Sequence, residues 1–202
     1  WQMILAGGPM MWPIILVSIF SAAIIIERFL FLKRLYIDIQ TFSVQLRDKI
    51  KHHQIKEAVQ LCDSAGNPVG NILKAAIVKY DRPRQQIKEA IEDAALYEMP
   101  KLHKNLPVLA TLVNVAGLLG FLGTVMGMVR VFGVLQSRSG QMLPVTVSDI
   151  SGGILEALLT TVAGLIVAIP VNIAHNYLVG KVNAFILQME QAATELINFL
   201  SE

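Results

Sequence analysis

The chain has 202 residues, of which 54% are hydrophobic and 16% are charged, and its mean hydropathy is +0.55. Because soluble domains carry about a quarter charged residues, this composition argues against a soluble domain and predicts an all-α membrane protein. The net charge of +2 gives no reason to expect a nucleic-acid partner, and the single cysteine, Cys62, excludes a disulfide framework.

The first apolar stretch lies at the N-terminus. Residues 1–26 carry no charge, and a run of about eighteen apolar residues is enough to predict a transmembrane helix. We therefore predict that residues 1–32 form an N-terminal segment and a first span, the helix itself covering 9–32. Glu27 and Arg28 end this span, and we interpret them as an interfacial charge pair rather than as part of a conduction path.

Residues 33–105 form a polar, helical stretch that holds thirteen of the seventeen basic residues. Apolar residues recur at helical spacing, first at Leu35, Ile39, Phe42, Leu46 and Ile50, then at Ile55, Val59 and Leu61. Asn67 and Pro68 predict an N-cap and first helical position for a segment reaching about Tyr80. Pro100 should kink or break a later helix. We predict a helical domain without enzyme features.

The histidines of this domain do not predict a metal centre. His52, His53 and His103 have no cysteine or acid at ligand spacing, so we expect solvent-exposed side chains. The chain also lacks His-Glu-x-x-His, Gly-x-Ser-x-Gly and phosphate-loop motifs. We therefore expect no enzyme activity, no metal and no cofactor.

Residues 106–180 are predicted to form a transmembrane hairpin. Its second span, 106–132, is rich in small residues, and the spacing of Gly120, Gly123 and Gly127 with Thr124 predicts close helix packing. The loop 133–150 holds two charges, so the positive-inside rule places 33–105 in the cytoplasm, the loop and N-terminus in the periplasm, and the C-terminus in the cytoplasm. Residues 181–202 continue as an amphipathic cytoplasmic tail.

Glu156 is the one acid of the third span. If the loop is centred near Gly140, Thr124 and Glu156 are each sixteen residues away and lie at about the same depth. Glu156 could line a polar path and bind and release protons, together with Thr124, Thr160 or Thr161. Alternatively it lies near the outer boundary, where it would only complement the helix N-terminus. The residues alone leave both interpretations open.

Several stretches resemble the ExbB/TolQ family of inner-membrane proton-channel subunits, within the MotA/TolQ/ExbB superfamily. The resemblance is carried by residues 106–111, 117–128 and 152–170, with further agreement at 24–29 and 175–177. A MotA-like chain would have two spans before its cytoplasmic domain, whereas this chain has one.

The resemblance implies a ring-shaped homopentamer whose second and third spans line a central pore in the bacterial inner membrane. The pore would hold an ExbD/TolR-like single-span partner with a membrane aspartate, and proton flow would drive a TonB- or TolA-like protein. By position, Thr124, Glu156 and Thr161 match the family's pore threonine, acid and following threonine. Because Thr160 is also a threonine, the hydroxyl that serves the path stays open.

The chain departs from the family at two positions. Gly117 stands where proline is common, and Arg130 stands where a neutral residue is common and adds a charge near the outer pore mouth. We expect no long N-terminal periplasmic extension, and we favour an ExbB-like over a TolQ-like pathway and protons over sodium. The competing hypothesis is a purely structural membrane scaffold that conducts nothing.

Overall fold

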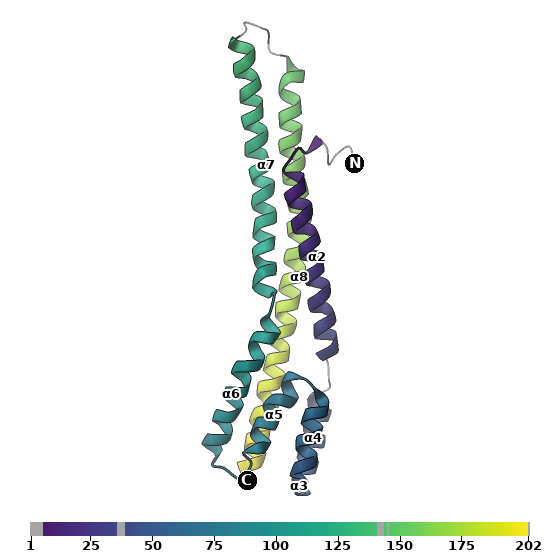
Figure 1. Ribbon diagram of the computed structural model, residues 1–202, viewed down its shortest axis with the longest axis vertical. Coiled ribbons are helices and arrows are strands. Elements are labelled where there is room, and N and C mark those ends of the chain that lie inside the picture. The colour runs from purple at the N-terminus through teal and green to yellow at the C-terminus, as the bar shows by residue number, and fades with distance from the viewer. Residues whose placement is uncertain (1–5, 36–38, 141–143, 145, 202) are drawn as a thin grey trace. The chain divides into compact units, whose positions relative to one another are not determined.

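The computed structural model describes residues 6–35, 39–140, 144 and 146–201, and within them every regular element is a helix. In chain order these are α2 (Met11–Leu35), α3 (Ile39–Lys51), α4 (Ile55–Ala65), α5 (Pro68–Val78), α6 (Arg84–His103), α7 (Leu106–Gly140) and α8 (Val147–Ser201) (Figure 1). By length and composition, three helical stretches could cross a membrane, and they include α2, α7 and most of α8. The prediction of an all-α membrane protein with three spans is confirmed.

The chain divides into two compact units. The first, which we call the membrane unit, comprises residues 1–28 and 105–177. The second, which we call the polar unit, comprises residues 29–104 and 178–202. Each unit is therefore built from two separate parts of the sequence, and α2 and α8 contribute residues to both.

The connection between α7 and α8 is shorter than the sequence predicted. α7 continues to Gly140 and α8 begins at Val147, so both ends of the expected loop 133–150 are helical. The apolar-to-polar change after Phe132 does not end the helix, because a helix can continue beyond an apolar stretch into a polar one.

The core of the polar unit largely follows the predicted periodicity. Leu35 and the α3 residues Ile39, Phe42, Leu46 and Ile50 are all buried, as expected. In α4, which is helical as predicted, Ile55, Val59 and Leu61 are only half-buried while Ala58 and Cys62 are fully buried. The buried side chains of α4 are therefore small, and a search for large apolar residues misses them.

The start of α5 is as predicted. Asn67 is the N-cap, its side-chain oxygen accepts a hydrogen bond from the Gly70 N–H at 2.7 Å, and Pro68 occupies the first turn. Gly66 ends α4 in the left-handed conformation, with φ of +57°, which glycine adopts without steric cost. α5 ends at Val78, two residues before the expected end.

Of the two predicted effects of Pro100, a kink or a break, the break does not occur, because Pro100 lies inside α6. The helix continues to His103, and the break falls at Asn105, whose φ is +62°. Proline in a helix costs roughly 3 kcal/mol. Here Leu102 is completely buried and Lys101 donates to the Glu98 carboxylate at 2.7 Å, so the turn after Pro100 is held by its own contacts.

The C-terminal part of α8 packs within the polar unit. Arg47 of α3 forms an ion pair with Glu195, and Arg84 Nη2 of α6 donates to Asn198 Oδ1 at 2.7 Å. The Lys51 ammonium lies 5.8 Å from the centre of the Phe199 ring. The buried face of this segment repeats at helical spacing, at Val182, Met189, Ala192, Ala193, Leu196 and Ile197.

Candidate functional site

Glycines bring α7 and α8 into close contact along the membrane unit. A Cβ added at Gly127 would lie 2.6 Å from the Gly153 carbonyl oxygen, and one added at Gly120 would lie 3.3 Å from the Gly164 Cα. A Cβ at Gly123 would overlap the Thr160 side chain. The three α7 glycines therefore face α8 where any larger residue would push the helices apart.

The contacts of these glycines set the register of the hairpin. Gly127 faces Gly153 and Ala157, while Gly120 faces Thr160 to Gly164. Thr124 is therefore level with about residue 158 of α8, and Glu156 lies about 3 Å nearer the connecting loop at 1.5 Å of rise per residue. The two residues lie at nearly the same depth, but their side chains have different partners.

Glu156 is buried and paired with a cation. Arg130 Nη1 of α7 donates to Glu156 Oε2, and the side chains are 55% and 7% exposed, respectively. Gly8, which precedes α2, lies directly against the carboxylate. Three parts of the chain thus meet at this acid, and its negative charge is compensated within the chain.

The threonines bond mainly to backbone carbonyls. Thr160 is completely buried, and its hydroxyl is 3.0 Å from the carbonyl oxygens of Glu156 and Ala157 on its own helix. Thr161 donates across the hairpin to the Gly120 carbonyl at 3.1 Å, with the Ala157 carbonyl at 3.2 Å. Thr124 donates to the Phe121 carbonyl at 2.6 Å. All three hydroxyls are therefore bonded to backbone carbonyls, Thr124 and Thr160 on their own helices and Thr161 on both helices, as threonines in membrane helices commonly are.

A second charge cluster lies at the other end of the membrane unit. Arg28 is 3% exposed, and its Nη2 and Nε atoms donate to the Glu27 carboxylate at 2.8 and 3.1 Å. Asn105 Nδ2 also donates to this carboxylate at 2.8 Å. From Leu106, which follows Asn105, to Gly127, which faces the residue after Glu156, α7 rises about 32 Å. The two charge clusters are thus separated by about one hydrocarbon thickness.

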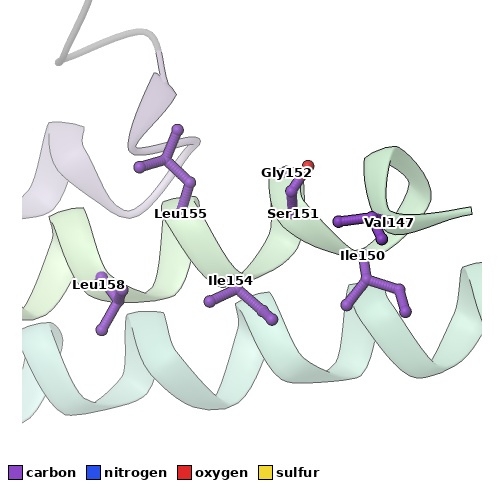
Figure 2. Close-up of a pocket in the computed structure, with 7 residues that line it drawn as sticks. All are labelled: Val147, Ile150, Ser151, Gly152, Ile154, Leu155 and Leu158. Carbon is purple, nitrogen blue, oxygen red and sulfur yellow. The ribbon is translucent and has the colours of Figure 1, made fainter.

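An apolar groove lies on the first turns of α8 (Figure 2). Seven α8 residues line it: Val147, Ile150, Ser151, Gly152, Ile154, Leu155 and Leu158. Only Ser151 among them has a polar side chain, so the groove is suited to hydrocarbon and not to a charged solute.

The histidines behave as the sequence predicted. His52, His53 and His103 are exposed. Across residues 6–35, 39–140 and 146–201, no group of three or more His, Cys, Asp or Glu side chains is placed to hold a metal ion.

Comparison with known sequences decides the class of the protein. The sequence profile of the MotA/TolQ/ExbB proton channel family matches residues 64–191, more than half of the chain. The chain belongs to this family. It is therefore a proton-channel-type membrane subunit, as the resemblance implied, and the family is one of transport-associated channels.

The relatives of this chain include proteins named after ExbB and a protein named TolQ. A putative biopolymer transport protein ExbB-like 3 from Synechocystis is 29% identical over 165 residues, covering 82% of this chain and 78% of that protein. A putative ExbB homolog from Methanothermobacter thermautotrophicus is 26% identical, covering 94% of this chain and 66% of that protein. The Tol-Pal system protein TolQ of Haemophilus influenzae is 36% identical over 110 residues, covering 53% and 46%.

Sequence reasoning missed the partner of Glu156. Arg130 was noted as an added charge at the pore mouth, but its ion pair with an acid 26 residues away depends on the register of the hairpin. The contact of Gly8 was also missed, because no pattern in the N-terminal segment predicts its position. A register deduced from the glycine spacing on both helices could have placed Arg130 one turn from Glu156.

Proposed function

We propose that this chain is the proton-conducting subunit of an inner-membrane motor. Together with an ExbD/TolR-like single-span partner it couples the proton motive force to work at the outer membrane, through a TonB- or TolA-like protein. The family supports proton conduction, and relatives named as biopolymer transport and Tol-Pal system proteins support a role in transport. The N-terminus is periplasmic and the C-terminus cytoplasmic, an orientation supported by the thirteen basic residues of 33–105.

The burial of Glu156 carries this proposal. An ionisable side chain in a membrane span is costly, so its presence indicates a function by default. Glu156 is 7% exposed at the α7–α8 contact, and Thr160 lies one turn further along the same helix. A scaffold held only by glycine packing would need neither the acid nor the arginine that compensates it.

In the proposed assembly, α7 and α8 of several copies, five by the family resemblance, surround the partner helix. Thr124, Thr160 or Thr161, and Glu156 line a polar path beside the partner's aspartate. One acid per chain is too few for a proton relay, which needs successive sites, so the partner carboxyl completes the path. In this arrangement Glu156 forms part of the wall, and the partner aspartate carries the proton.

The test is proton flux into vesicles containing the chain together with an ExbD/TolR-like protein. We expect Glu156→Ala and Thr124→Ala each to reduce pH-driven flux about tenfold or more, because each removes a polar group from the path. Glu190→Gln is the matched control, since Glu190 is an exposed acid on the tail of the same helix and should leave flux unchanged. Size-exclusion chromatography checks that each complex still assembles.

The scaffold hypothesis makes the opposite prediction. It expects Glu156→Gln to have no effect on activity and no proton flux to accompany it. Full flux in both the Glu156 and Thr124 variants would therefore refute the pore assignment.

A further inference from the structure

We propose that Arg130 is a positioning residue that holds the Glu156 carboxylate in place at the outer end of the path through their ion pair. The inference rests on the proposed function, because it assigns Glu156 a fixed role within the same path. It goes beyond that function by naming the group that fixes the position of the acid.

The two members of the pair differ in their exposure. The Glu156 carboxylate is 7% exposed, whereas the Arg130 side chain is 55% exposed. A buried carboxylate without a cation would be strongly disfavoured in its charged form. Arg130 supplies that cation from the facing helix, through a direct hydrogen bond from Nη1 to Oε2.

Gly8, from a third part of the chain, lies against the Glu156 carboxylate. Its φ is +69°, and a Cβ at this position would overlap the Glu156 carboxyl group. Any other residue would have a strained backbone and would also displace the acid. The N-terminal segment therefore approaches the Glu156 carboxylate closely only because this position is glycine.

Among the charged side chains that the structure describes in the membrane unit, Arg130 is the one that contacts Glu156. Arg138 lies on the same helix about 12 Å further along it. Glu27 and Arg28 lie at the opposite end of the spans, with Asn105 bonded to Glu27. Among these charged side chains, Arg130 is therefore the cation that pairs with Glu156.

Carbodiimide labelling tests this assignment, because dicyclohexylcarbodiimide modifies protonated carboxyl groups in apolar surroundings and spares ionised ones. The assay uses the full chain in membranes, and mass spectrometry identifies the peptide that carries Glu156. We expect little labelling of wild-type Glu156 at neutral pH and about tenfold more in Arg130→Gln, because the acid then lacks its cation. Arg130→Lys should retain most of the protection.

Arg138→Gln is the matched control and should label like the wild type. Equal labelling of Glu156 in the wild type and in Arg130→Gln would overturn the assignment, whether both are labelled or both are spared. This result does not depend on proton flux. A wild type that conducts no protons would refute the proposed function. The comparison of Glu156 labelling between the wild type and Arg130→Gln would still test the role of Arg130.

A charge exchange covers the possibility that Arg130→Gln misfolds. Arg130→Glu and Glu156→Arg should each lose most of the proton flux, while the double variant recovers more than about a third of it, because the two residues act as a pair. A double variant as inactive as the single variants, despite normal assembly, would contradict the pairing.

Discussion

At the scale of single residues, the membrane unit compensates its charges within the chain. Glu156 is paired with Arg130, and Glu27 is paired with Arg28 and bonded by Asn105. Breaking a buried pair by removing one partner leaves an uncompensated charge and is more costly than never having had the pair. The effect of a substitution at one of these positions should therefore be compared with the effect of the double substitution of the pair.

Cys62 gives the polar unit a pH-dependent stability. Burial, helped by the neighbouring Asp63, raises the pKa of this thiol from 9.0 to about 12, although Lys74 acts in the opposite direction. The folded state therefore holds the thiol proton more tightly than the unfolded state does. The stability that this provides is fully present below about pH 9 and is lost as the pH rises towards 12.

We therefore expect the wild type to lose thermal stability faster than Cys62→Ala when the pH is raised from about 8 to about 10. The measurement is the unfolding midpoint of both proteins in the same detergent, and the difference between them isolates the thiol. Alkylation by iodoacetamide provides a check, because a buried, protonated thiol reacts slowly. Rapid alkylation of the folded protein, or parallel loss of stability in both proteins, would contradict this account.

At the scale of helices, the α7–α8 contact depends on which glycines face the partner helix. A Cβ at Gly127 would meet Gly153 and Ala157, whereas a Cβ at Gly117 has no atom of the chain within 4 Å among those described. The same substitution at two positions of one helix should therefore have opposite effects.

We expect Gly127→Ala to destabilise the protein by about 1–3 kcal/mol, because the helices must separate to admit the methyl group. Gly117→Ala, the matched control, should be neutral or slightly stabilising, since alanine favours helix by up to about 1 kcal/mol. Thermal unfolding in detergent measures both. Equal losses in the two variants would show that backbone flexibility, and not helix contact, is what these glycines provide.

The sequence predicted the helices better than their ends and contacts. The α3 stripe and the Asn67–Pro68 start of α5 follow from local rules, because both depend on neighbours within a few residues. The end of α6 did not follow, because tertiary contacts of Leu102 outweigh the effect of Pro100. The partner of Glu156 depends on interhelical register, which periodicity within one helix does not contain.

At the scale of the whole molecule, the distribution of charge predicts orientation in the membrane. Cys62 is the only cysteine, so a Cys62→Ala background allows single cysteines to be introduced and labelled. Ser139 near the end of α7 and His52 after α3 are both exposed in the structure. A membrane-impermeant maleimide should label Ser139→Cys in intact spheroplasts and His52→Cys only after permeabilisation.

The reverse labelling pattern would invert the proposed orientation. Labelling of both positions before permeabilisation would indicate leaky cells, which an untagged cytoplasmic marker protein detects. The assay concerns topology alone and does not require the partner or proton flux.

The composition of the polar unit has a consequence for synthesis on the ribosome. Its core combines residues 29–104 with residues 178–201 of α8, and contacts such as Arg47–Glu195 and Arg84–Asn198 join the two. The first part emerges from the ribosome before either hairpin span is made, and its closing helix emerges last. The nascent polar unit therefore stays incomplete, with its apolar face uncovered, until both hairpin spans have been synthesised and inserted. Premature termination anywhere after residue 104 would therefore yield a product exposed to proteases and chaperones.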